Sequence, residues 1–313
     1  MCMFYDGLRR LEMSVKQAEL MMLFVTFSWS SSYLLMKIAL TGVDPFTLML
    51  LRFSIAFLCV LPLLLRTLKF CTKRTVVKSL VLGFLVYSSL FGTIMGLKHT
   101  TASTAAFLGT TAVVLVPILE AIWTRKMPPM LTILSIALAF VGLVLFTVKD
   151  GLSLDIGALY CLWGAFGYAV YILVVGRMAN EDDMFPASLL QFGAIAIFSA
   201  ISAYVFETPH LPQTGLQWGA VLGLAVVCSA FCFVMQSIVQ RYLSPSRTGL
   251  IFSMEPVFAA ILAYFILDEV MDGQGLIGAL LIMIANVLKN IVYRIRYMNA
   301  QRKRKIWNRK RVA

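Results

Sequence analysis

Long apolar stretches alternate with short polar segments along nearly the whole chain. A helix needs about 20 mainly apolar residues to cross the hydrocarbon core of a bilayer. Backbone groups in lipid must be satisfied within their own segment, and a β-barrel would instead show alternating stretches of about 10 residues. The pattern therefore predicts ten membrane-spanning helices, at 18–38, 45–65, 77–97, 102–123, 129–148, 155–176, 186–206, 216–238, 246–267 and 273–293.

Composition supports an all-α membrane protein. Hydrophobic residues make up 60% of the 313 residues and charged residues 13%, whereas soluble domains average about 25% charged residues. The first 16 residues are polar and mixed, and the first apolar stretch is too long and too rich in serine for a cleaved signal peptide. We expect that stretch to remain as the first helix.

The basic residues predict an orientation. Most of the 27 Lys and Arg residues lie in alternate loops, while the opposite ends of the helices carry Lys37, Lys98 and Lys149. Cytoplasmic loops carry the excess of positive charge. We therefore expect a multi-pass protein of the cell membrane with both termini in the cytoplasm. The basic tail should contact anionic lipid headgroups, a simpler explanation of its charge than nucleic-acid binding.

The two halves of the chain are similar. Residues 98–111 match 241–254 at a constant offset of 143, and the same offset places 131–148 on 274–291. A repeat of five helices has an odd number of crossings, so the second copy enters the membrane from the opposite side. The predicted organisation is a cytoplasmic segment at 1–17, repeats at 18–148 and 155–293, and a basic tail at 294–313.

Inverted repeats are typical of secondary transporters, whose substrate sites lie near the bilayer midplane between the halves. Four stretches of the sequence are informative about its family, namely WSSSYLLMKIAL, DPFTLMLLRF, GLKHTTASTAAFL and RYLSPSRTGLIFSMEPVFAAILAYFILDEV. In these stretches the chain resembles the drug/metabolite transporter superfamily, in its ten-helix EamA-type branch, and the resemblance extends over about 18–293. It implies export or exchange of metabolites by alternating access.

Ionisable residues within the spans are candidate functional groups, because charge in hydrocarbon is costly. Glu255 precedes Pro256 near the middle of a span, and proline removes a helix hydrogen bond there. Glu255 is a candidate proton-coupling or cation-binding carboxylate, or a structural acid that ties a broken helix to a neighbour. Arg52 could hold a substrate carboxylate or pack against a polar neighbour.

A second proline, Pro117, is a candidate hinge together with Pro256. Glu120 follows it by three residues and precedes Arg125 and Lys126 by about one turn. A gate or a surface ion pair is therefore favoured over substrate contact for Glu120.

A central cavity also needs a lining of aromatic and hydroxyl side chains. Packing of small residues and interfacial anchoring are the alternative explanations of the same residues. The candidate lining residues are Trp29, Ser31, Tyr33, Thr110, Trp163 and Tyr168.

Catalytic signatures such as HExxH, GxSxG and GxxxxGK[ST] are absent from the sequence. We therefore expect no enzyme activity, no cofactor and no metal site. The acidic run at 181–183 is interpreted as solvated charge rather than as a metal site. The six cysteines are scattered without metal-ligand spacing.

The favoured function is secondary transport of a small metabolite, an amino acid or related compound, in the export direction and with protons as a candidate coupling ion. One alternative is a phosphorylated-sugar or nucleotide-sugar antiporter, which would favour several basic residues at mid-membrane, where this chain offers Arg52. A non-transporting membrane sensor or an intramembrane enzyme is the other alternative. It would need a signalling domain or a catalytic cluster, and the sequence offers neither.

Overall fold

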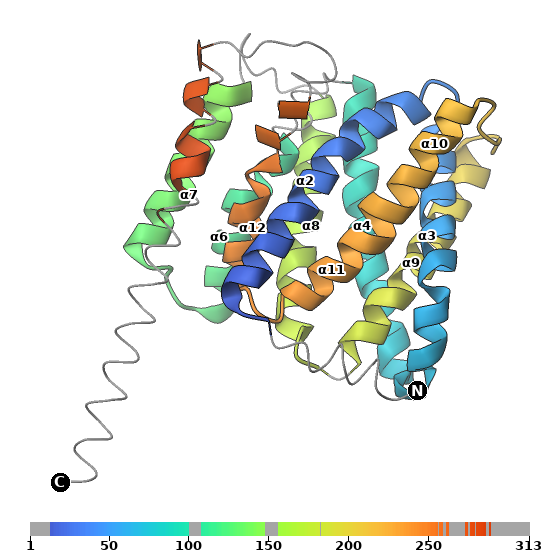
Figure 1. The fold of residues 1–313 in the computed structure, drawn as a ribbon, viewed down its shortest axis with the longest axis horizontal. Helices are drawn as coiled ribbons and strands as arrows, with labels where there is room; N and C mark the ends of the chain where they lie inside the picture. The colour runs from blue at the N-terminus through green and yellow to red at the C-terminus, as the bar shows by residue number, and fades with distance from the viewer. Residues whose placement is uncertain are drawn as a thin grey trace.

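The computed structural model describes residues 13–99, 108–147, 156–181 and 183–255, with shorter pieces between 257 and 288. All regular structure in these segments is helical (Figure 1). The helices are α2 (Val15–Ala39), α3 (Pro45–Thr67), η1 (Leu68–Phe70), α4 (Lys73–His99), α6 (Ala112–Thr124), α7 (Met130–Thr147), α8 (Ile156–Met178), α9 (Met184–Phe206), α10 (Gly215–Gly223), η2 (Leu224–Phe231), α11 (Cys232–Val239) and α12 (Pro245–Phe252).

Several predicted spans are confirmed as long helices. Among the described residues, five helices are long and apolar enough to cross a membrane, namely Pro45–Phe70, Lys73–Gly96, Ile156–Met178, Met184–Phe206 and Gly215–Val239. Helix α2 has 25 residues but carries a run of serines that lowers its hydropathy. Further apolar helices are shorter. The predicted spans 102–123, 246–267 and 273–293 lie partly outside the described residues, so the total of ten stays a prediction.

Large apolar side chains cover the outer surface of the bundle. On α9, the exposed residues Ile197, Ile201 and Tyr204 follow each other at helical spacing and form one stripe. Water-soluble monomers rarely expose continuous apolar surface of this kind. Lipid contact explains the stripe, in agreement with the composition.

Helices α4 and α8 pack closely through small residues. A Cβ atom on Gly92 would lie 2.5 Å from the Tyr160 carbonyl oxygen, and one on Gly164 would lie 2.8 Å from that of Ser89. The Ser89 hydroxyl donates to the Gly164 carbonyl at 2.8 Å. Small side chains let helix backbones approach in this way. The contacts run in opposite order along the two helices, which are therefore antiparallel.

Helix α2 packs in the same antiparallel manner on the continuous helix formed by α10, η2 and α11. The thiol of Cys232 lies 4.0 Å from the Val25 carbonyl oxygen, whereas Gly223, farther back along its helix, faces Leu35. At one edge of the bundle α7 lies beside the helix at Leu276–Ala285, while α3, α9 and α10 form the opposite edge (Figure 1). The interior where the long helices meet is therefore framed by antiparallel pairs.

Candidate functional site

Aromatic rings from five helices meet around Phe233 of α11. Its ring centroid lies 5.3 Å from that of Trp29 in α2, 6.3 Å from Phe53 in α3, 6.1 Å from Tyr171 in α8 and 6.2 Å from Phe192 in α9. All five residues are buried. We call them, with the polar groups described next, the central cluster.

Trp29 and Tyr168 lie together in this cluster, with ring centroids 6.0 Å apart. The Trp29 indole donates to the Cys228 carbonyl oxygen at 2.7 Å. The Tyr168 hydroxyl donates to Gln236 Oε1 at 3.3 Å, and its ring stacks on that of Tyr171. Each of these aromatic residues thus presents a ring face while its polar atom is held by another helix.

Serine hydroxyls of α2 face the same region. Ser31 donates to the Ser28 carbonyl at 2.7 Å and lies 3.9 Å from the Cys228 thiol. The Ser30 hydroxyl lies within 2.9 Å of the Thr26 carbonyl oxygen and 2.8 Å of the Glu255 carbonyl oxygen. Helix α2 therefore holds the backbone of the chain where α12 has ended.

The side chain of Glu255 belongs to the same cluster. Its carboxylate is close enough to the Tyr168 hydroxyl and the Cys228 thiol to interact with both electrostatically. The neighbouring Pro256 lies outside the described residues, so its hinge role stays a prediction.

Arg52 is buried in α3, with 5% of its surface exposed. Its Nε donates to the Ser229 hydroxyl at 2.5 Å, and Nη1 lies 4.0 Å from the Met36 sulfur. The guanidinium carbon is 5.4 Å from the centroid of Phe53. Within the described part of the chain, no carboxylate lies within ion-pair distance of Arg52.

The η2 segment is a π-helix, which the sequence pattern did not predict. The Cys232 amide donates to the carbonyl oxygens of Ser229 and Val227 rather than to that of Cys228, its partner in an α-helix. The Cys228 carbonyl instead accepts a hydrogen bond from the Trp29 indole. The neighbouring Ser229 reaches Arg52. π-helical segments inside α-helices occur frequently at functional sites. The sequence carries no signal of the π-helix itself, although the seven-residue spacing of Ser229 and Gln236 indicates that these two polar residues lie on one helix face.

Several buried polar atoms near the cluster have no hydrogen-bond partner among the described residues. They include the Tyr171 hydroxyl, both amide atoms of Gln191 and Nε2 of Gln236. The Tyr171 hydroxyl lies beside the Gln191 amide without a well-formed hydrogen bond. Buried polar groups are nearly always satisfied, so unsatisfied ones mark a place where a polar ligand would gain hydrogen bonds.

Other predicted lining residues are placed differently. Trp163 is 59% exposed on α8, and its indole donates to the Ser88 hydroxyl at 2.9 Å. Trp163 is thus exposed whereas Trp29 is buried, and a role for Trp163 in lining the cavity stays a prediction. Thr110 is buried just before α6, and its role stays a prediction. The side chain of Tyr33 lies outside the described residues.

Glu120 contacts α12 rather than the basic residues that follow it. Its carboxylate accepts hydrogen bonds from the amide of Ser246 at 3.0 Å and from the hydroxyl of the same residue. A carboxylate at the start of a helix accepts hydrogen bonds from free backbone amides and interacts favourably with the helix dipole. Next to it, Arg247 Nε donates to Glu19 of α2 at 2.6 Å. Two carboxylates from the first half therefore hold the first turn of α12, while Pro117 is buried within α6.

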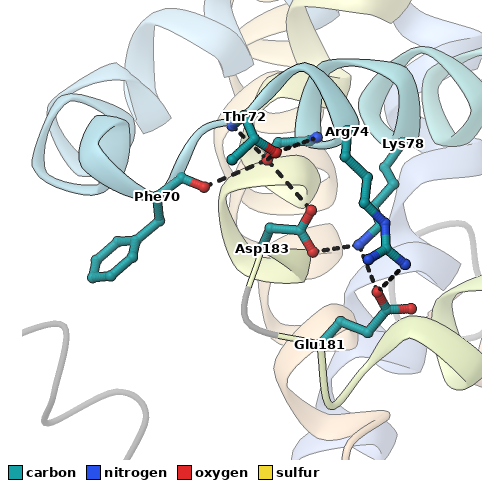
Figure 2. A network of polar contacts seen from close by, with 7 residues as sticks. Phe70, Thr72, Arg74, Lys78, Glu181 and Asp183 are labelled. Atoms are coloured by element: carbon teal, nitrogen blue, oxygen red, sulfur yellow. Dashed lines mark hydrogen bonds and ion pairs between the residues drawn. The ribbon is translucent and has the colours of Figure 1, made fainter.

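Figure 2 shows a second ionic group, which joins α4 to the segment between α8 and α9. Buried Lys78 contacts Glu181 at 2.8 Å and also Asp183. Exposed Arg74 contacts Glu181 at 2.9 Å. The interpretation of this acidic run as solvated charge is therefore wrong for these two residues, because a lysine distant in sequence pairs with both.

Lys78 also affects the ionisation of Asp183. Burial alone would raise the pKa of Asp183, but its hydrogen bond to Lys78 and the nearby positive charges lower that pKa overall. Among the described residues, no group of His, Cys, Asp and Glu side chains could hold a metal ion.

The chain matches a known protein family. The sequence model of the EamA-like transporter family matches the chain twice, at residues 16–148 and 155–290. A protein of Archaeoglobus fulgidus named "Uncharacterized transporter" is 30% identical over 287 residues, covering 91% of this chain and 88% of its own length. The "Uncharacterized transporter YcxC" of Bacillus subtilis is 24% identical, with 83% of this chain and 88% of its own length covered.

A solved crystal structure has the same fold. It covers 90% of this chain and 99% of its own, with a TM-score of 0.75 and 19% sequence identity. At this identity the likeness concerns the fold alone. The family matches, the named relatives and the apolar helices agree with one another. The chain belongs to the EamA-like transporter family and is a multi-pass membrane transporter without enzyme activity.

Proposed function

We propose that the protein is a secondary transporter that moves a small metabolite, an amino acid or related compound, across the cell membrane in the export direction by alternating access. The observation that carries this proposal is the central cluster. It combines aromatic faces, unsatisfied hydrogen-bonding groups, one cation and one carboxylate in the interior of an apolar bundle. These are the elements of a ligand site, namely apolar walls with a few placed polar groups.

The proposed arrangement is two inverted five-helix repeats around that cluster. A two-fold axis in the membrane plane would exchange the antiparallel pair of α4 and α8 with the pair of α2 and the α10–α11 helix. The stacked rings of Phe53 and Phe192, 6.3 Å apart, would be symmetry mates. The two matches to the family model support the same arrangement, as does the general construction of secondary transporters.

The proposed gate lies at the end of the bundle where α9 and α12 begin, at contacts that join the two halves. There Glu120 and Glu19 hold the start of α12, and Lys78 holds the segment before α9. Alternating access requires such links to open when the opposite end closes. Breaks near Pro117 and Pro256 would let the helix ends move separately, because proline removes helix hydrogen bonds.

The test is counterflow in proteoliposomes loaded with unlabelled compound and supplied with labelled compound outside. The panel consists of amino acids, organic cations and sugar phosphates. We expect exchange with amino acids or related compounds and none with sugar phosphates. Sugar phosphates would favour several basic residues, whereas Arg52 is the one buried cation of the cluster without a carboxylate partner among the described residues. Flux of sugar phosphates would favour the antiporter alternative, and no flux with any compound would contradict transport.

A further inference from the structure

Three basic side chains are buried in the described part of the chain, namely Arg52, Lys78 and Arg247. Lys78 pairs with two carboxylates, and Arg247 pairs with Glu19. Arg52 instead contacts a hydroxyl, a thioether and a ring face. Of the three buried cations, it alone lacks a neutralising anion among the described residues.

An unpaired buried charge is expensive, because the loss of hydration is not recovered by an opposite charge. The partners of Arg52 recover little of it. A neutral hydroxyl gives a single hydrogen bond, and a thioether sulfur at 4.0 Å is a weak acceptor. The guanidinium fork matches the geometry of a carboxylate, which Arg binds through two parallel hydrogen bonds.

Resting on the transport function proposed above, we propose that Arg52 is the anion subsite of the central cluster and binds a single carboxylate of the transported compound. The incoming carboxylate takes the place of the Ser229 hydroxyl on the guanidinium. Ser229 lies on the π-helix and Arg52 on α3. Ligand binding therefore exchanges a contact between two helices for a contact with the ligand.

A carboxylate fits this subsite better than a phosphate ester. A phosphate monoester carries close to two negative charges at neutral pH, and one guanidinium would leave part of that charge buried without compensation. If Phe53 and Phe192 are symmetry mates, the position that matches Arg52 carries the neutral Gln191, whose side-chain amide has no hydrogen-bond partner among the described residues. Arg52 thus suits a single negative charge, and Gln191 suits an uncharged hydrogen-bonding group.

The experiment compares compounds that differ in the carboxylate alone. Wild-type protein and the variants Arg52→Gln and Arg52→Lys are reconstituted in proteoliposomes. Counterflow is measured with leucine and phenylalanine and with their decarboxylated amines, isoamylamine and phenethylamine. Wild-type protein should prefer the amino acids. The uptake of amino acids by Arg52→Gln should be at least about tenfold lower than by wild-type protein, because a charge-assisted bidentate contact disappears. Arg52→Lys should show an intermediate rate, because lysine keeps the charge but lacks the guanidinium fork.

Arg177→Gln, which removes an exposed arginine that lies over the Trp123 ring, is the matched control and should transport like wild type. Amino-acid uptake by Arg52→Gln within twofold of wild type would overturn the inference, as would a wild-type preference for the amines.

A second readout separates this inference from transport itself. The same four compounds are added to detergent-solubilised protein, and the shift of the thermal unfolding midpoint is measured. A ligand that binds the folded state raises this midpoint. A shift in wild type that is lost in Arg52→Gln, without counterflow, would support the anion subsite while contradicting transport. Equal shifts in both proteins, or no shift in wild type with either amino acid, would contradict the subsite.

Discussion

At the scale of single residues, the cluster contains two kinds of polar group. Some are held by another helix, such as the Trp29 indole on the Cys228 carbonyl. Others, such as the Gln191 amide, have no partner among the described residues. The first kind should position the helices, because a buried hydrogen bond is costly to break. The second kind should respond to the substrate.

Replacing Trp29 with Phe tests the first kind. The ring is largely kept, but the Cys228 carbonyl loses its donor. Leaving a buried acceptor unsatisfied costs about 1–3 kcal/mol. We expect a lower thermal unfolding midpoint in detergent and slower counterflow. Trp163→Phe is the control, because its indole bonds to Ser88 on the exposed surface and should matter little. Equal effects of the two changes would contradict a positioning role for Trp29.

Replacing Glu255 with Gln tests proton coupling. If the carboxylate carries the proton, the neutral amide cannot exchange it, and the pH dependence of uptake should disappear in Glu255→Gln while exchange at a single pH continues. Uptake is measured in proteoliposomes with and without an imposed pH gradient. Unchanged pH dependence would leave Glu255 with a structural role beside Tyr168.

At the scale of helices, two features decide how the segments are joined. The π-helix turns the Cys228 carbonyl towards α2 and Ser229 towards α3, so that one segment contacts two neighbours. The ionic group around Lys78 joins α4 to the start of α9. The π-helix lies inside the apolar bundle, and the ionic group lies where the chain leaves it.

The ionic group around Lys78 should make the stability of the folded protein depend on pH in the acidic range. Because the folded protein lowers the pKa of Asp183 below its usual value of 3.8, this residue stabilises the fold fully above that value. The stabilisation is lost as pH falls through the lower pKa of the folded state. We expect the thermal midpoint in detergent to fall in acid, and to fall less in Asp183→Asn. An identical acid response in both proteins would show that the pair with Lys78 contributes little.

At the scale of the whole molecule, the proposed inverted-repeat arrangement depends on the antiparallel pairing of helices from the two halves. Each of the pairs α2 with α10–α11, α3 with α9, and α4 with α8 brings together segments far apart in the sequence (Figure 1). If the halves are inverted repeats, an even number of spans places both ends of the chain on one face.

Single-cysteine labelling tests that topology. Each of three variants carries a single cysteine, with the other cysteines replaced by serine or alanine. One variant keeps the native Cys2, and the other two carry a new cysteine at Gln213 or at Ala313. A membrane-impermeant maleimide is applied to intact cells and to inverted vesicles. We expect positions 2 and 313 to react in inverted vesicles, and position 213 in intact cells. Labelling of 2 and 313 from different faces would remove the inverted arrangement.

Much of the fold followed from the sequence alone. The predicted span 216–238 is the helix Gly215–Val239, and 186–206 is α9 at Met184–Phe206. Apolar length predicts these helices because lipid requires each segment to satisfy its own backbone. The π-helix within Gly215–Val239 was missed, because hydropathy reports where a segment lies and not which backbone acceptor each amide uses.

The candidate site was predicted in part. Trp29, Arg52, Tyr168 and Glu255 do meet in the interior, as expected of polar groups that lipid cannot satisfy. Trp163 was placed there by its likeness to Trp29, yet it lies on the exposed face of α8. A repeat in sequence does not determine the rotation of a helix about its axis, which depends on the packing of all its neighbours.

The amino-acid pattern by itself determined that this chain is a helical membrane protein with a few polar groups inside it, because the bilayer imposes one requirement on every segment separately. Which polar groups have partners was decided by the tertiary structure. Lys78 finds two carboxylates and Arg52 finds none among the described residues, although both are basic residues near or within apolar segments. The difference arises because pairing depends on distances between helices, and local sequence carries no measure of them.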